Sequence, residues 1–149
     1  MTPLKTVIFI DQNFSTQEDV FHFLAEKAVT EGFSNESEAV YTALTKREKE
    51  GTTGMMDGFA IPHGKSPAIT QPGIVIVKLN KGLEWESMDG KPTNFILSML
   101  IPENQQGEGH LKILSQVARM LMKESVKNDL QHATKVEEIE NIINQQISL

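Results

Sequence analysis

Apolar residues along the chain occur in two patterns: short unbroken runs, and runs that repeat every three or four positions. The unbroken runs are rich in β-branched and aromatic residues and predict strands at residues 7–10, 59–61, 73–79, 83–87 and 94–101. Residues 94–101 are nearly all apolar, which is typical of a central strand covered on both faces. The turn signal Asp89-Gly90 lies between the last two runs and predicts a hairpin.

The repeating apolar pattern predicts helices on either side of this block of strands. Two helices follow the first strand, one ending at Gly32 and the next before Gly51, and an apolar-striped helix opens at His110. Residue pairs typical of helix starts are Ser15 with Glu18, Asn35 with Glu38, and Thr134 with Glu137. The last of these pairs precedes a closing helix.

This order of elements predicts an α/β (α+β) fold, a mixed β-sheet flanked by helices on both faces. The 149 residues fit one domain, 1–149, which is long enough to bury a core. The chain contains no internal repeat, low-complexity tract or linker rich in Pro, Gly and Ser. Oligomeric state is left open, because the sequence shows no heptad repeat.

The composition excludes several classes of protein. A formal net charge of −6 argues against a nucleic-acid binder, whose affinity comes largely from Lys and Arg at phosphates. The absence of cysteine removes disulfides, cysteine-based zinc sites and thiol nucleophiles. No run approaches the ~20 apolar residues of a membrane span, and residues 7–10 are too short for a secretory leader. We therefore expect a cytoplasmic protein with no direct membrane insertion.

His63 is the first candidate for chemistry. It follows Ala60-Ile61-Pro62 at the end of a short predicted strand, where the proline restricts the backbone and so constrains the direction of the ring. Gly64 lacks a Cβ and would let a bulky anion approach the backbone beside the ring. Pro-His-Gly is also common in ordinary turns, so a solvent-exposed histidine without a role is an equally good interpretation.

Two further residues suit an anion. His110 lies at the predicted start of a helix, where free N–H groups and the helix dipole favour an anion and keep the ring neutral. Arg47, near the end of the second helix, can hold a phosphate through its planar guanidinium. The alternatives are a surface histidine with no task and an arginine that caps its own helix.

The other candidates carry less weight. His22, in a predicted helix, and His132, in a polar stretch, are interpreted as residues without a chemical role. Met55, Met56 and Phe59 are either core residues or part of an adaptable docking surface. Nucleotide-binding glycine motifs and the His-Glu-x-x-His zinc motif are absent, so we expect no cofactor and no metal. The residues by themselves support a histidine-centred anion site.

Two motifs occur in order along the chain. The first is Arg47-Glu48, then Thr52-Thr53-Gly54, then Asp57-Gly58-Phe59-Ala60-Ile61-Pro62-His63, and the second is Gly109-His110-Leu111-Lys112-Ile113-Leu114-Ser115. With Trp85 and Asp89-Gly90, they resemble enzyme IIA of the fructose/mannitol class (EIIA type 2) in the bacterial phosphoenolpyruvate-dependent sugar phosphotransferase system (PTS). The resemblance covers about residues 9–143.

The resemblance implies a phosphoryl carrier with a mixed sheet flanked by helices. His63 would accept a phosphoryl group from the phosphocarrier HPr and pass it to a cysteine of enzyme IIB, which works with a membrane enzyme IIC. His110 and Arg47 match the positions that steady the phosphoryl oxygens in the family. The physical logic agrees, because an imidazole nitrogen that is neutral near pH 7 is a competent nucleophile.

Two other functions fit the same residues. A regulatory module of the nitrogen-related branch of the family would use the same phosphohistidine to control partner proteins, with no sugar involved. A metal-binding hydrolase using His63 and His110 is a third hypothesis, although the sequence offers no carboxylate cluster to complete such a site. Acceptance of the phosphoryl group by a sugar-specific enzyme IIB would distinguish transport from regulation.

Overall fold

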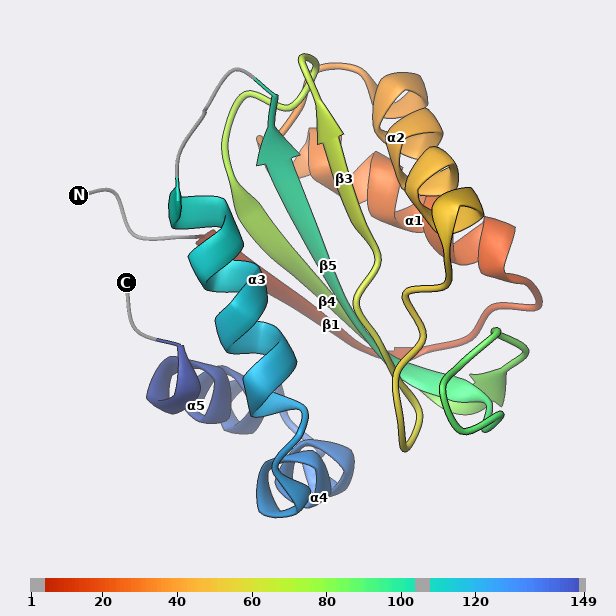
Figure 1. Cartoon of the computed structure of the whole chain (residues 1–149), viewed down its shortest axis with the longest axis vertical. Helices are drawn as coiled ribbons and strands as arrows, with labels where there is room; N and C mark the ends of the chain where they lie inside the picture. Colours follow the sequence, from red (N-terminus) through yellow and green to blue (C-terminus); the bar gives the residue numbers. More distant parts are fainter. Residues whose placement is uncertain (1–4, 104–107, 148–149) are drawn as a thin grey trace.

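The structure, a computed structural model, describes residues 5–103 and 108–147, with only the backbone for residues 108–111. Its centre is a five-stranded sheet with helices on both faces, which confirms the predicted α/β fold (Figure 1). In chain order the elements are β1 (Lys5–Gln12), α1 (Gln17–Thr30), α2 (Ser37–Glu50), β2 (Phe59–Ala60), β3 (His63–Ser66), β4 (Gly73–Leu83), β5 (Thr93–Pro102), α3 (Glu108–Met120), α4 (Glu124–His132) and α5 (Val136–Gln146).

The sheet is mixed, as the sequence predicts. β1 lies parallel to β4, and β4 lies antiparallel to β5. β2 and β3 follow one another along the other side of β5, and both are parallel to it. β5 is thus an interior strand, and residues 95–100 are all buried, in agreement with their unbroken apolar run.

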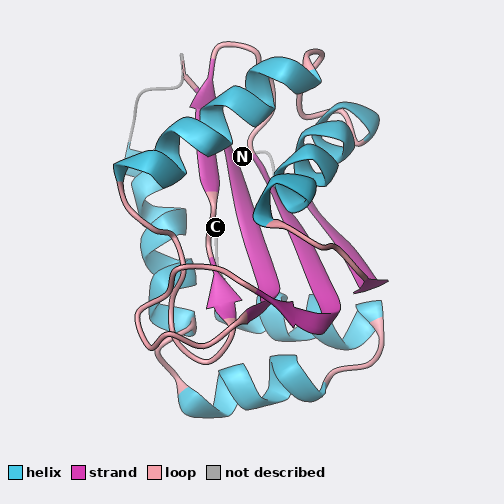
Figure 2. Cartoon of the chain, turned by 90° about the vertical axis from the view of Figure 1, so that its right-hand side faces the viewer, coloured by secondary structure: helices cyan, strands magenta, loops and turns pink. Residues whose placement is uncertain are grey.

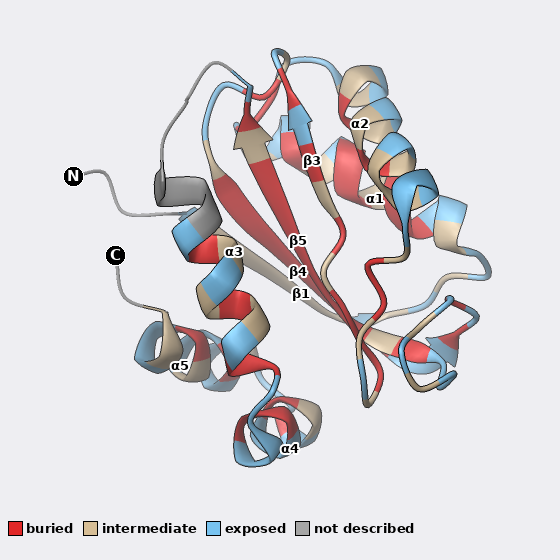
Figure 3. Cartoon of the chain, viewed as in Figure 1, coloured by how far each residue is buried: buried red, intermediate tan, exposed pale blue. Residues whose placement is uncertain are grey.

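The two helical layers enclose separate apolar cores. α1 and α2 cover one face of the sheet, and Leu24 of α1 packs there in one cluster with Val75 of β4. α3, α4 and α5 cover the other face (Figure 2), where Val117 and Leu130 share a cluster with Ile74. Successive side chains of β4 pack into opposite cores, because side chains along a strand alternate between the two faces of the sheet. Buried residues accordingly line β4 and β5 in Figure 3.

The hairpin formed by β4 and β5 is longer than the sequence predicts. β4 continues to Leu83, which pairs with Thr93, so the separate strand predicted at residues 83–87 is wrong. Asp89-Gly90 does lie in a turn, with the glycine at a φ of 74°, within the connecting loop 84–92. This loop packs beside the segment that leads to His63.

Two strands at the sheet edges also differ from the prediction. β1, expected to be buried, is half-buried over most of its length because it has a strand neighbour on one side only. β3 was not predicted, because its sequence His-Gly-Lys-Ser has no strand pattern. This segment is a strand because it pairs with β5. His63 therefore opens a strand instead of ending one.

The predicted C-terminal ends of the helices agree with the structure better than their predicted N-terminal starts. α1 ends before Gly32, at a φ of 85°, and α2 ends before Gly51, as predicted. The cap of α1 is Thr16, whose hydroxyl accepts a hydrogen bond from the Asp19 N–H (3.1 Å), and not Ser15. The predicted starts of α2 and α5 provide no side-chain cap. Within residues 5–103 and 108–147, no helix has the length and apolarity needed to cross a membrane.

Candidate functional site

His63 lies at the edge of the sheet. Its partner on β5 is Met99, which belongs to the core on the α3 side, so the His63 side chain leaves the edge strand on that face, because paired residues of neighbouring strands share a face. Gly64 faces the other way, and a Cβ at Gly64 would lie 3.3 Å from Cβ of Ala43 in α2. The expected approach of an anion to the Gly64 backbone is therefore wrong, because α2 occupies that space.

Arg47 brings a guanidinium from the last turn of α2 to the His63 ring. Its Nε donates a hydrogen bond to Nε2 of His63, with 3.0 Å between the two nitrogens. Its Nη1 donates to the carbonyl oxygen of Gly51, the residue that follows α2, at 2.7 Å. The two sequence interpretations of Arg47 are therefore compatible, because one side chain both contacts the end of its own helix and faces the histidine.

The hydrogen bonds of the His63 ring determine which nitrogen carries the proton. Nδ1 lies 3.0 Å from the carbonyl oxygen of Ile61, which can only accept, so Nδ1 bears the hydrogen. Nε2 accepts from Arg47, so Nε2 carries a lone pair and no proton. A neutral ring held in this tautomer presents Nε2 as a nucleophile beside a fixed positive charge.

Burial keeps this ring neutral. Desolvation of the half-buried imidazole lowers the pKa of His63 below its ordinary value of 6.5, and the Arg47 charge acts in the same direction. The hydrogen bond to Ile61 and the carboxylates of Glu48 and Glu50 raise the pKa but do not offset the burial. Near neutral pH the ring is therefore in its nucleophilic form.

The lowered pKa predicts a pH dependence of stability. The unfolded chain binds a proton on His63 near pH 6.5 and the folded chain only at lower pH, so acid favours unfolding. The contribution of neutral His63 is fully present above pH 6.5 and is lost as the pH falls from 6.5 to the folded-state pKa. Urea unfolding of the wild type and His63→Gln at about pH 7.5 and about pH 5.5 should show the larger acid loss in the wild type. Equal losses in both proteins would contradict the prediction.

The segment between α2 and β2 packs tightly against the loop 84–92. The Thr52 hydroxyl donates a hydrogen bond to the carbonyl oxygen of Glu86. Gly54 is buried beside this contact, where a Cβ would lie 2.2 Å from the same carbonyl oxygen and 2.9 Å from Cα of Ser87. Gly54 also bridges to Ala60, two residues before the Pro62-His63 pair. The glycine is thus required for the two loops to meet.

A Gly54→Ala variant should be less stable than the wild type by about 1–3 kcal/mol, because the added methyl group overlaps backbone atoms that cannot move alone. Urea or thermal unfolding measures the loss. Gly51→Ala is the matched control, because a Cβ at Gly51 meets no atom within 4 Å. Equal stability of the two variants would show that the loops can separate without cost.

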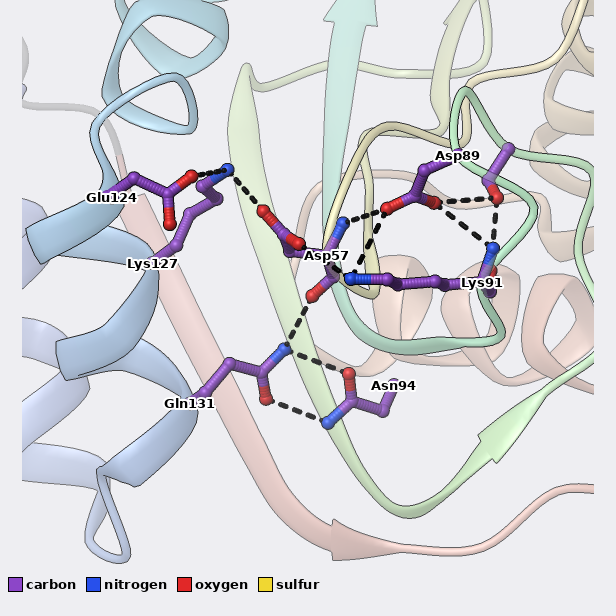
Figure 4. A network of polar contacts seen from close by, with 8 residues as sticks. Asp57, Asp89, Lys91, Asn94, Glu124, Lys127 and Gln131 are labelled. Atoms are coloured by element: carbon purple, nitrogen blue, oxygen red, sulfur yellow. Dashed lines mark hydrogen bonds and ion pairs between the residues drawn. The ribbon is translucent and has the colours of Figure 1, made fainter.

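Asp57 ties the same segment to helix α4 (Figure 4). Its carboxylate pairs with Nζ of Lys127 in α4 (2.5 Å) and of Lys91 in the loop 84–92 (3.1 Å), which lowers the pKa of Asp57. Its backbone N–H donates to the Asp89 carboxylate (2.8 Å), and Gln131 of α4 donates to its carbonyl oxygen (3.2 Å). The sequence gives no signal for these partners, because Lys127 is 70 positions away from Asp57.

The other histidines do not join His63 within the described part of the chain. His110 lies in the first turn of α3, but its side chain is outside the described residues. His22 is exposed and stacks on Tyr41, with 4.0 Å between ring centroids. His132 is exposed at the end of α4, where its Nδ1 lies 2.8 Å from the Asn128 carbonyl oxygen.

Of the residues considered for a docking surface, Phe59 and Met55 pack in the core and Met56 lies on the surface. Phe59 is fully buried against Phe95, with 5.0 Å between ring centroids, and Met55 packs partly into the same core. Met56 is 47% exposed, and Met88 in the neighbouring loop is 70% exposed. Among residues 5–103 and 112–147, no group of three His, Asp or Glu side chains is placed to hold a metal ion.

Comparisons with known proteins agree with this architecture. Residues 4–146 match the family model described as "Phosphoenolpyruvate-dependent sugar phosphotransferase system, EIIA 2". The chain is 34% identical over 143 residues to the fructose-specific EIIA component of Haloferax volcanii, covering 96% of this chain and 92% of that protein. Some other relatives are longer, and the chain spans 21% of one and 22% of another.

Solved structures show the same fold. Nitrogen regulatory protein IIA-Ntr from Neisseria meningitidis superposes with a TM-score of 0.85 at 30% identity, covering 92% of each chain. Mannitol enzyme IIA from Escherichia coli, solved in complex with phosphorylated mannitol enzyme IIB, gives a TM-score of 0.77 at 23% identity, covering 93% and 94% of the two chains. The second match concerns the fold alone.

The fold and the matched residues define the class of this protein as a phosphotransferase component. The chain belongs to the EIIA type 2 family of the phosphoenolpyruvate-dependent sugar phosphotransferase system.

Proposed function

We propose that this chain is a cytoplasmic carrier, built as one domain over residues 1–149, that takes a phosphoryl group from phosphorylated HPr onto Nε2 of His63. It then passes the group to a cysteine of enzyme IIB for uptake and phosphorylation of a fructose- or mannitol-like sugar by the membrane enzyme IIC. The observation that carries the proposal is the state of Nε2, which is unprotonated and 3.0 Å from the Arg47 guanidinium.

The transfer step uses groups that are already in place. Nε2 attacks phosphorus, a P–N bond forms, and the bond from phosphorus to the donor atom of HPr breaks, its electron pair leaving with HPr. The ring keeps its Nδ1 proton, and the Ile61 carbonyl, 3.0 Å from Nδ1, stabilises the positive charge that the ring gains. Transfer to the cysteine thiolate of enzyme IIB reverses these changes and restores the neutral ring.

Arg47 has a second role in this scheme. Its Nε–H occupies the lone pair of Nε2 before the reaction, so the contact must break as phosphorus arrives. The guanidinium then faces the phosphoryl oxygens while Nη1 remains bonded to Gly51, so a positive charge is held where negative charge passes. His110, in the first turn of α3, is proposed as a second support for the phosphoryl oxygens, as the resemblance of its motif suggests.

The sugar branch is supported by the similarity to the fructose-specific protein of Haloferax volcanii. Enzyme IIB as a partner is supported by the mannitol pair from Escherichia coli, whose enzyme IIA has the same fold. The exposed Met56, on the segment that leads to His63, offers adaptable apolar surface for such partners. A regulatory role is the second candidate, because the Neisseria meningitidis structure with a TM-score of 0.85 is a nitrogen regulatory IIA-Ntr.

Reconstitution tests the proposal and separates the two branches. Incubation with phosphoenolpyruvate labelled with ³²P, enzyme I and HPr should give an acid-labile, base-stable label that mass spectrometry places on His63. Addition of a fructose- or mannitol-specific enzyme IIB should then move the label to that protein. Labelled His63 that no sugar-specific enzyme IIB can discharge would favour the regulatory branch, and absence of label would overturn the carrier function.

A further inference from the structure

The carboxylate of Glu48 holds the segment that precedes His63. Glu48 adjoins Arg47 in α2, but its two oxygens have a different partner. Oε2 accepts a hydrogen bond from the backbone N–H of Thr53 (3.0 Å), and Oε1 accepts one from the Thr53 hydroxyl (2.5 Å). Thr53 is 4% exposed, so this two-point contact fixes a buried residue relative to the helix that carries Arg47.

One residue, Ile61, connects Thr53 to the His63 ring through hydrogen bonds. The carbonyl oxygen of Thr53 accepts a hydrogen bond from the Ile61 N–H (3.0 Å). The carbonyl oxygen of Ile61 in turn accepts the proton on Nδ1 of His63 (3.0 Å). The backbone N–H of Ile61 therefore contacts Thr53, and its carbonyl oxygen contacts His63.

The other side of this short segment is held separately. The carbonyl oxygen of Pro62 accepts a hydrogen bond from the Met99 N–H of β5 (3.0 Å), and proline has no N–H of its own to offer. The sheet thus holds Pro62, and the link from Glu48 to Thr53 holds Ile61. Without that link, Thr53 would lose its anchor to α2, and with it one of the contacts that set the Ile61 carbonyl against Nδ1.

We propose that Glu48 and Thr53 are positioning residues that help to select the tautomer of His63, beside the Arg47 hydrogen bond at Nε2. By holding the Ile61 carbonyl against Nδ1, they keep the proton there and leave the lone pair on Nε2. In the opposite tautomer Nε2 carries hydrogen, so it can neither accept from Arg47 nor attack phosphorus. The inference rests on the proposed function for its effect on rate, but the tautomer itself is a property of the isolated protein.

The tautomer is measured directly by ¹⁵N chemical shifts of the imidazole in long-range ¹H–¹⁵N NMR spectra, recorded at a pH where the ring is neutral. Wild-type His63 should show a protonated Nδ1 and an unprotonated Nε2. In Glu48→Ala, and to a smaller extent in Thr53→Val, the two shifts should move toward each other as the tautomers mix. Thr53→Ser restores the hydroxyl and should return the wild-type shifts.

A matched control separates positioning from charge. Glu50→Ala removes a carboxylate from the same helical turn, and the Glu50 and Glu48 charges both act to raise the pKa of His63. Glu50 is exposed, so its removal leaves the anchor intact. Glu50→Ala should therefore keep the wild-type tautomer. A Glu50→Ala spectrum like that of Glu48→Ala would overturn the positioning role.

The second readout is the single-turnover rate of phosphoryl acceptance from phosphorylated HPr. Glu48→Ala should lower the rate by up to about 100-fold and Thr53→Val by about tenfold, with the dependence on HPr concentration unchanged, because reacting groups are misplaced and docking is not. If Glu48→Ala does not fold, the Thr53→Val and Thr53→Ser pair carries the test, because both keep most of the side-chain volume.

The outcomes distinguish this inference from the function on which it rests. Tautomer mixing in the variants of a protein whose wild type takes no label would support the positioning role and overturn the carrier function. Folded Glu48→Ala and Thr53→Val proteins with wild-type ¹⁵N shifts and wild-type rates would overturn the positioning role and leave the carrier function in place.

Discussion

His63→Gln is expected to incorporate no phosphoryl group under conditions that label the wild type fully. Glutamine has a polar side chain of similar reach, but its amide nitrogen is not a nucleophile, so no P–N bond can form. ³²P incorporation from phosphoenolpyruvate through enzyme I and HPr measures the effect. The variant should remain folded, because the ring is half-buried at the sheet edge and is not part of either apolar core.

The matched controls for this prediction are the two exposed histidines. His22 stacks on Tyr41, and His132 lies at the end of α4. Among the side chains that the structure describes, no arginine donates a hydrogen bond to either ring. His22→Gln and His132→Gln should therefore label like the wild type. Label that persists in folded His63→Gln would mean that another residue is the acceptor.

Arg47→Ala is expected to lower the rate of phosphoryl acceptance by about 100- to 1000-fold, the cost of removing a preorganised donor from a site of developing charge. Arg47→Lys should recover only part of the loss, because an ammonium group cannot contact Gly51 and the phosphoryl oxygens with two fixed N–H groups. Single-turnover labelling measures both variants. The tautomer of His63 should persist, because Ile61 still accepts from Nδ1.

Lys49→Ala is the control for charge in this second prediction. Lys49 is an exposed cation two residues after Arg47 in the last turn of α2, so it changes the net charge by the same amount. Its removal should alter the rate only slightly, and more at low salt than at high salt. An Arg47→Ala rate equal to that of Lys49→Ala would assign the effect to general attraction between proteins.

The fold was predictable where apolar pattern decides structure. Residues 94–101 form a covered strand because nearly every side chain enters a core, and the helix ends at Gly32 and before Gly51 are where glycine ends a helix. β3 was not predictable, because its residues form a strand only by pairing with β5. α4 was also missed, because its sequence is mostly polar and only three of its residues are buried.

The site was predictable only in part, and for a different reason. The motif order pointed to His63 and Arg47 as candidates, and the structure places Nε of Arg47 3.0 Å from Nε2 of His63. The partners of Asp57 in α4 could not be found, because contacts across long sequence separations leave no local pattern. The link from Glu48 through Thr53 and Ile61 to His63 was missed because each of its three steps uses at least one backbone atom, which every residue possesses.

The second hydrogen bond of Arg47, to the carbonyl that follows its own helix, bears on how fast such a carrier can work. A long cationic side chain has about 2 kcal/mol of rotamer entropy to lose when it is immobilised. Here the Arg47 side chain is already held by the Gly51 carbonyl oxygen before any partner arrives, so this rotamer entropy is lost during folding and not during binding. In the proposed transfer, each encounter then requires the exchange of one Arg47 contact, from a ring nitrogen to an incoming phosphoryl oxygen, which suits a protein that would be loaded and emptied in every cycle.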